Sequence, residues 1–158
     1  MITEGFLHAM TRSPTPSRPQ ASEGTGLSAT QPAGARILVV EDDYLVGLTI
    51  EDALVDAGYE FLGQITSGEE AVRQGPSLRP DLVLMDIRLA GPMTGIEAAV
   101  ELRKAGLRCL FASAHSEGII RNSADLAEPL GWLAKPFSAD QLLAAVGAAL
   151  AGLRRDAD

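Results

Sequence analysis

The sequence predicts a single α/β domain in which five short parallel strands alternate with helices. From residue 35 onward, short apolar runs alternate with segments whose apolar residues recur at helical spacing. Three of the runs are apolar on both faces, as expected for strands that helices cover on both sides of a sheet. Charged or hydroxyl side chains follow four of the runs, at the carboxyl strand ends where such sheets bind ligands.

The predicted strands are short, and they occupy residues 37–40, 59–65, 82–85, 109–112 and 130–134. Apolar spacing predicts helices at residues 45–57, from residue 67, at 96–105 and at 138–153, and the polar segment 116–128 is predicted as the remaining helix. Ser67, with Glu70 three residues later, forms a capping-box pattern at the start of the second helix. Pro76 and Pro80 are predicted to end that helix, and Ser138 is predicted to cap the last one.

The chain divides into a tail, one domain and a short end. Residues 1–34 are rich in Ser, Thr, Pro and Gly and have no apolar periodicity, so we expect a disordered N-terminal tail. Residues 35–154 contain all the predicted strands and helices and form the domain. Residues 155–158 form a short C-terminal end, which we expect to be too short for a DNA-binding or enzymatic output domain.

The composition of the 158 residues argues against several classes of protein. A net charge of −8 and the lack of a Lys and Arg cluster argue against nucleic-acid binding, which requires phosphate neutralisation. No apolar run reaches the roughly 18 residues of a membrane span, and the first residues do not resemble a secretory signal. The one cysteine, Cys109, excludes an internal disulfide and lies in an apolar run, where a buried thiol is expected. We therefore expect a cytoplasmic protein.

Reactive side chains follow the predicted strands. Asp42 and Asp43 follow the first strand, Asp86 the third, Ser113 the fourth and Lys135 the fifth. Because parallel strands end at one edge of a sheet, we expect these side chains to share a pocket. Carboxylates suit Mg²⁺, lysine and hydroxyl groups can bind phosphoryl oxygens, and Asp86 remains as the nucleophile of a phosphoryl transfer. Taken singly, Asp42 and Asp43 would be interpreted as a solvated turn or helix cap, Asp86 as a strand-end turn and Lys135 as a surface residue. Their joint position at the strand ends favours the phosphoryl site.

Three segments of the sequence carry a family resemblance. They are RILVVEDDYLVGLTIEDALVDAGYE (36–60), PDLVLMDIRLAG (80–91) and WLAKPF (132–137). Over about residues 35–153 the chain resembles the receiver domain of two-component response regulators. The resemblance implies a flavodoxin-like, doubly wound sheet of five parallel strands in the order 2-1-3-4-5, with five helices. It also implies a stand-alone receiver, and LFASAH (110–115) is similar to the Phe-Ala-Thr-Gly-Tyr subgroup of that type.

The resemblance also implies roles for the residues of the predicted pocket. Asp86 would be the phosphoacceptor, and Asp42 and Asp43 would be the acidic pair that helps to hold Mg²⁺. The backbone carbonyl of Arg88 would complete the protein ligands. Lys135 would bind the phosphoryl group, and its peptide bond to the following proline is expected to be cis.

Two further residues are implied to transmit the signal. Ser113 matches a hydroxyl that moves toward the phosphoryl group, and Trp132 stands where the family often places an aromatic residue that turns inward on phosphorylation. The alternative for Trp132 is a partly buried strand residue that never moves.

The resemblance implies a function in a phosphorelay. The phosphoryl donor would be a phosphohistidine on a sensor histidine kinase or a histidine phosphotransfer protein. The signal would pass to a downstream protein partner or onward by phosphotransfer, and we expect no nucleic-acid or membrane partner. Such a protein catalyses only its own phosphorylation and dephosphorylation, so we expect no other enzymatic activity.

Three other functions fit the residues less well. A phosphatase of the haloacid dehalogenase type needs a second aspartate two places after the nucleophile, where this chain has Arg88. A flavodoxin-like FMN binder needs a Ser, Thr or Gly loop after the first strand, where the carboxylates at 41–43 would repel the phosphate. A degenerate receiver that binds partners without phosphorylation would not need the full set of pocket residues.

Overall fold

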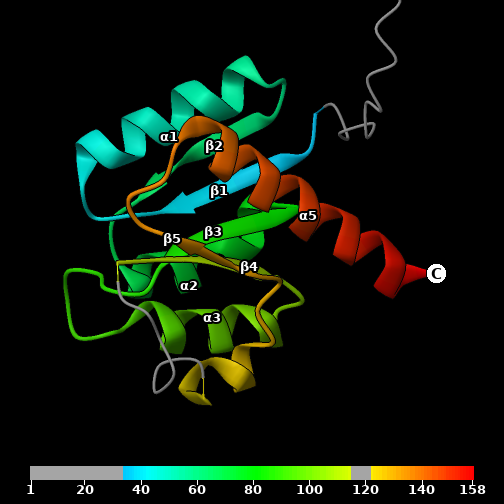
Figure 1. The fold of residues 1–158 in the computed structure, drawn as a ribbon. Helices are drawn as coiled ribbons and strands as arrows, with labels where there is room; N and C mark the ends of the chain where they lie inside the picture. Colours follow the sequence, from blue (N-terminus) through cyan, green and yellow to red (C-terminus); the bar gives the residue numbers. More distant parts are fainter. Residues whose placement is uncertain (1–33, 115–121) are drawn as a thin grey trace, which may run out of the picture.

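A computed structural model describes residues 34–114 and 122–158 of the chain. Its centre is one sheet of five parallel strands in the order β2-β1-β3-β4-β5 (Figure 1). The strands are β1 (Arg36–Val40), β2 (Glu60–Ile65), β3 (Leu82–Asp86), β4 (Cys109–Ser113) and β5 (Trp132–Ala134). The predicted fold class, a flavodoxin-like doubly wound sheet of this order, is confirmed.

Helices cover both faces of the sheet. α1 (Tyr44–Asp56) and α5 (Ala139–Ala157) lie on one face, and α2 (Gly68–Leu78) and α3 (Gly95–Lys104) lie on the other (Figure 1). The helix predicted at 116–128 lies partly outside the described residues. Its described part is helical from residue 122 and continues into the 3₁₀ helix η1 (Asp125–Ala127). None of the described helices is long and apolar enough to cross a membrane.

The core consists of two apolar layers separated by the sheet. Alternate residues of β1 point to opposite faces, so Ile37 and Val39 pack toward α1 and α5 while Leu38 and Val40 pack toward α2 and α3. Every residue of β3 and β4 is buried. The doubly apolar runs of the sequence are therefore the central strands of the sheet.

Both ends of α2 differ in detail from the sequence patterns. Ser67 caps the helix by accepting a hydrogen bond of 3.3 Å from Glu70 N–H, but the Glu70 side chain accepts from Arg73 and Gln74 and does not complete a capping box. Pro76 lies inside the helix, which runs on to Leu78. Only two helical residues follow this proline, and the helix ends where Arg79 adopts a left-handed conformation with φ 50°.

The last helix is longer than predicted. Ser138 caps α5 as expected, through a capping box with Gln141. The helix runs to Ala157 rather than ending near Leu153, so residues 155–157 continue the domain instead of forming a separate end. Its sequence is rich in alanine, which favours helix. The positive charges of Arg154 and Arg155 in the last turn stabilise the helix because they lie at the negative end of its dipole. The predicted tail at 1–34 lies outside the described residues except for its last residue, and its disorder stays a prediction.

Burial of the single cysteine leads to a chemical prediction. Cys109 is 1% exposed in β4, and burial raises the pKa of its thiol to about 12. Because only the thiolate reacts, we expect an aromatic disulfide reagent at pH 8 to label the folded protein at least roughly a hundredfold more slowly than the denatured chain. The absorbance of the released thiol measures both rates. Prompt labelling of the native protein would show that β4 is accessible.

Candidate functional site

The carboxyl ends of the strands bring the predicted site residues to one edge of the sheet, on the left in Figure 1. Glu41 and Asp42 follow β1, and Asp86 ends β3. Ser113 ends β4, and Lys135 follows β5 directly. Asp86 pairs with Ala112 and Ser113 with Ala134, so the ends of β3, β4 and β5 lie in neighbouring register.

Asp86 is a buried carboxylate whose two oxygens have different partners. Only 7% of the residue is exposed. Its Oδ2 lies 3.1 Å from Nζ of Lys135, and its Oδ1 accepts a hydrogen bond of 3.2 Å from the backbone N–H of Arg88. These two donors hold the carboxylate in one orientation at the strand end. A buried anion beside a cation is the arrangement expected of a poised nucleophile.

Lys135 joins Asp86 to a second buried carboxylate. Nζ of Lys135 lies 2.5 Å from Oε2 of Glu41, and the exposed fractions of the two side chains are 19% and 3%. Burial alone would lower the pKa of Lys135, but its hydrogen bonds to Glu41 and Asp86 outweigh burial and raise that pKa. For Glu41 burial dominates and raises the pKa of the carboxyl group. Lys135 therefore stays protonated at neutral pH, and its single positive charge is shared between the two carboxylates.

Three carboxylates form a group that fits a cation. Glu41, Asp42 and Asp86 each offer an oxygen, and these oxygens lie within 4.8 Å of one another. Asp42 is exposed while the other two are buried, so the group is open to solvent on one side. An all-oxygen set of this size matches the preference of Mg²⁺, which keeps several water ligands.

The structure does not bring Asp43 into this group, contrary to the predicted acidic pair. Asp43 is the N-cap of α1, and its Oδ1 accepts hydrogen bonds of 2.9 Å from Leu45 N–H and 3.2 Å from Val46 N–H. Its place in the group is taken by Glu41, which the sequence analysis did not assign as a ligand. The N-cap preference for aspartate directly before a helix is the signal that would have separated the two roles.

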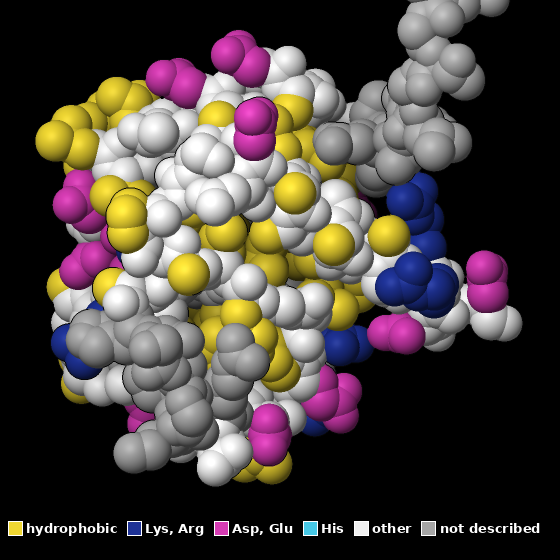
Figure 2. Space-filling model, in the orientation of Figure 1, with side chains coloured by type: hydrophobic (Ala, Val, Ile, Leu, Met, Phe, Trp, Pro, Cys, Tyr) yellow, Lys and Arg dark blue, Asp and Glu magenta, His cyan; other side chains and the backbone are white. Residues whose placement is uncertain are grey.

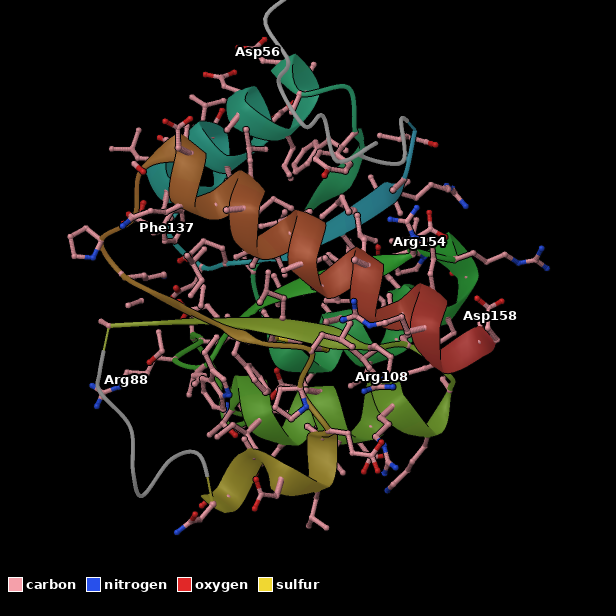
Figure 3. All side chains as sticks on the ribbon, turned by 45° about the vertical axis from the view of Figure 1, so that its right-hand side comes forward. Asp56, Arg88, Arg108, Phe137, Arg154 and Asp158 are labelled. Carbon is pink, nitrogen blue, oxygen red and sulfur yellow. The ribbon has the colours of Figure 1, made fainter. Side chains whose placement is uncertain are left out.

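Arg88 and Ser113 lie at the same edge. Arg88 is exposed, as its labelled side chain in Figure 3 shows, and its carbonyl as a metal ligand stays a prediction. Ser113 is 6% exposed, and its backbone carbonyl accepts a hydrogen bond of 2.8 Å from Lys135 N–H. This bond ties the end of β4 to the lysine. The Lys135–Pro136 peptide bond is cis, as the resemblance implied.

Trp132 is half-buried at the start of β5. Its ring packs against Phe111 of β4 with 5.1 Å between ring centroids and an interplanar angle of 32°. Both residues belong to the apolar layer that faces α2 and α3. Trp132 therefore faces the protein in this structure, and a change of its position on phosphorylation stays a prediction.

Comparison with known proteins identifies the family. A family model for the response regulator receiver domain matches residues 37–147. The chain belongs to this family. Among similar proteins, the chemotaxis protein CheY of Thermotoga maritima is 32% identical over 72% of this chain and 95% of its own length. The CheY of Bacillus subtilis is 34% identical over 73% of this chain and 97% of its own length.

Longer proteins match as well. The transcriptional regulatory protein PdtaR of Mycobacterium tuberculosis is 32% identical over 75% of this chain, which spans 58% of the length of that protein. A solved receiver domain of a modulated diguanylate cyclase from Desulfovibrio desulfuricans matches with a TM-score of 0.71 and 36% identity, covering 77% of this chain and 97% of that one. CheY4 of Vibrio cholerae matches with a TM-score of 0.67 and 26% identity, over 72% and 97%. Membership of the Phe-Ala-Thr-Gly-Tyr subgroup stays a prediction.

Sequence analysis also missed a glycine that the site requires. Gly95, the first residue of α3, donates its N–H to the carbonyl of Ile87 at 2.9 Å. A Cβ at this position would lie 1.9 Å from the carbonyl oxygen of Asp86 and 2.9 Å from Cα of Ile87. Only glycine lets α3 start this close to the backbone of the proposed nucleophile.

We expect Gly95→Ala to lower the free energy of unfolding by about 2 kcal/mol, since backbone must move to admit the methyl group. Denaturant unfolding measures the loss. Gly152→Ala in α5 is the matched control, because apart from its chain neighbours and the nearby backbone of its own helix no atom lies within 4 Å of a Cβ there, and alanine should add up to about 1 kcal/mol. Equal stability of the two variants would contradict the close contact.

Proposed function

We propose that this receiver domain accepts a phosphoryl group on Asp86 from a phosphohistidine, in a phosphorelay. The observation that carries the proposal is the buried Asp86 carboxylate, 3.1 Å from the Lys135 ammonium and next to two more carboxylates. A stable ion pair alone would need no exposed third acid beside it. A phosphoryl site needs an anionic nucleophile, a cation for the phosphoryl oxygens and oxygen ligands for a metal.

The proposed transfer is a single displacement. A carboxylate oxygen of Asp86 attacks phosphorus, an O–P bond forms, and the P–N bond of the phosphohistidine breaks. The electron pair of that bond stays on the imidazole nitrogen of the donor. The product is an acyl phosphate on Asp86, and Lys135 and Ser113 donate hydrogen bonds to its oxygens.

Glu41, Asp42 and Asp86 are the side chains that would hold Mg²⁺, together with the carbonyl of Arg88. They fit Mg²⁺ because all their ligand atoms are oxygens and because these oxygens lie within 4.8 Å of one another. When bound, Mg²⁺ supplies positive charge for the phosphoryl oxygens. Asp43 then contributes indirectly, because its cap fixes the start of α1 next to Asp42.

An exposed apolar surface beside the site supports a protein as phosphoryl donor. Tyr44 is 70%, Leu45 71% and Leu48 40% exposed on α1, where Figure 2 shows hydrophobic side chains at the left end of the helix. Next to them lies a mostly apolar pocket of about 350 Å³, which is lined by Val46, Thr49, Ala114, Lys135, Pro136 and Phe137. Figure 3 places Phe137 just before α5, at the same edge as Arg88. A sensor histidine kinase or histidine phosphotransfer protein would dock here and present its phosphohistidine to Asp86.

In the proposed function the protein acts in the cytoplasm, and it catalyses no reaction except its own phosphorylation and dephosphorylation. Arg88 stands where a haloacid dehalogenase would need its general acid, which supports the second point. The signal would leave through a protein partner, or by onward phosphotransfer, after Ser113 and Trp132 adjust to the phosphoryl group.

Asp86→Asn tests the nucleophile. We expect no phosphoryl incorporation from phosphoramidate with Mg²⁺ present, because the amide oxygen is a poor nucleophile. Intact-protein mass spectrometry measures the added phosphoryl group. Asp52→Asn, at an exposed acid of α1, is the control and should be phosphorylated like the unsubstituted protein. Incorporation into Asp86→Asn would refute the proposed acceptor.

The single tryptophan reports on the proposed switch. We expect beryllofluoride with Mg²⁺ to change the emission of Trp132, since its contact with Phe111 would be altered. Fluorescence emission spectra measure the change, and Asp86→Asn should show none. An unchanged spectrum in a protein that is phosphorylated normally would remove the switching role of Trp132 and leave Asp86 as the acceptor.

A further inference from the structure

Gln64 ties together the loop that carries the acidic residues. It lies in β2, one residue before that strand ends, beside Val39 of β1. Its side-chain amide donates two hydrogen bonds, at 2.7 Å to the carbonyl of Glu41 and at 3.1 Å to the carbonyl of Asp43. These carbonyls flank Asp42, the exposed member of the carboxylate group. Because both partners are acceptors, only the NH₂ end of the amide can satisfy them.

A glycine in α1 makes room for this amide. A Cβ at Gly47 would lie 2.0 Å from Oε1 and 2.2 Å from Cδ of Gln64. Gly47 is the buried fourth residue of the helix, where glycine lowers helix stability relative to alanine. Its own N–H donates to the carbonyl of Asp43 at 3.0 Å, so that carbonyl accepts from both residues. The contact with Gln64 explains a residue that otherwise weakens α1.

We infer that Gln64 is a positioning residue for the metal-binding carboxylates, and that Gly47 is the residue that permits it. The inference rests on the proposed function of the Asp86 site. Asp42 reaches the carboxylate group only if the backbone on both sides of it keeps its path. The two hydrogen bonds of Gln64 fix the path at the residues before and after Asp42. Removing such outer partners of a metal site typically weakens metal binding by 10- to 100-fold.

A purely structural role for Gln64 makes a different prediction. The same two bonds satisfy the backbone carbonyls of the buried Glu41 and the exposed Asp43, and their loss would lower stability without changing the site of the folded protein. The affinity for Mg²⁺, measured well below the unfolding temperature, separates the two roles.

The first test is Gln64→Met, which keeps the length of the side chain and removes both donors. We expect roughly tenfold weaker Mg²⁺ binding by calorimetric titration of the full chain at a temperature where circular dichroism shows it folded. Phosphorylation by phosphoramidate should slow at low Mg²⁺ and recover at saturating Mg²⁺. Gln74→Met is the control, because the amide of Gln74 bonds only to Glu70 in α2 among the described residues.

The second test leaves Gln64 in place. Gly47→Ala should displace the amide and weaken Mg²⁺ binding by a similar factor, although alanine favours the helix. Gly152→Ala, a helical glycine with free space around it, should leave binding unchanged. The double variant Gly47→Ala/Gln64→Met should bind no more weakly than either single variant, since both remove the same two bonds.

Each result decides a separate point. A folded Gln64→Met protein with unchanged Mg²⁺ affinity overturns the positioning role, and if that variant does not fold, Gly47→Ala decides. A weakened Gln64→Met beside an unchanged Gly47→Ala overturns the role of Gly47. If the unsubstituted protein binds no Mg²⁺ and accepts no phosphoryl group, the proposed function itself fails, and the inference fails with it.

Discussion

The ion pairs of Lys135 with Glu41 and Asp86 are the interaction on which the site depends. They join residues that follow β1, β3 and β5, at 2.5 Å and 3.1 Å. Two nearly buried carboxylates at one sheet edge would repel each other and lose their hydration without a cation between them. Lys135 therefore allows the strand ends to converge at the edge where the proposed phosphoryl transfer would take place. Because the lysine is partly exposed, it also remains able to meet a phosphoryl oxygen.

The surrounding structure holds this edge from three directions. The fully buried strands β3 and β4 fix the positions of Asp86 and Ser113. Gly95 lets α3 begin directly against the backbone of Asp86. Gln64 holds the loop after β1 from the side of β2. The apolar surface of α1 is different, because its side chains are exposed and are available to a partner. The buried residues that support the site and the exposed apolar residues of α1 thus lie close together in the sequence.

Most of the fold could be predicted from the sequence, but only some of the site residues could. Strand burial on both faces and the helix caps at Ser67 and Ser138 follow from local patterns, and the convergence of Asp86, Ser113 and Lys135 follows from the parallel order of the strands. The choice between Asp43 and Glu41 was missed, because it depends on the exact residue that caps α1. Gly95 and Gly47 were missed for a related reason. A glycine shows its purpose only when the opposing atom, distant in sequence, is known.

The net charge of the site residues indicates how phosphorylation of Asp86 would change the structure around it. Three carboxylates, Glu41, Asp42 and Asp86, and one ammonium, Lys135, carry a formal net charge of −2, since −3 + 1 = −2, which one divalent cation would neutralise. An acyl phosphate on Asp86 would replace a single charge by about −1.5 to −2, so up to about one further negative charge must be accommodated. Lys135 is already shared between two carboxylates. The remaining donor at this edge that the resemblance implies is the hydroxyl of Ser113, and its carbonyl is bonded to the backbone of Lys135. Recruiting that hydroxyl would therefore pull on β4 and β5 together, beside the ring contact of Phe111 with Trp132.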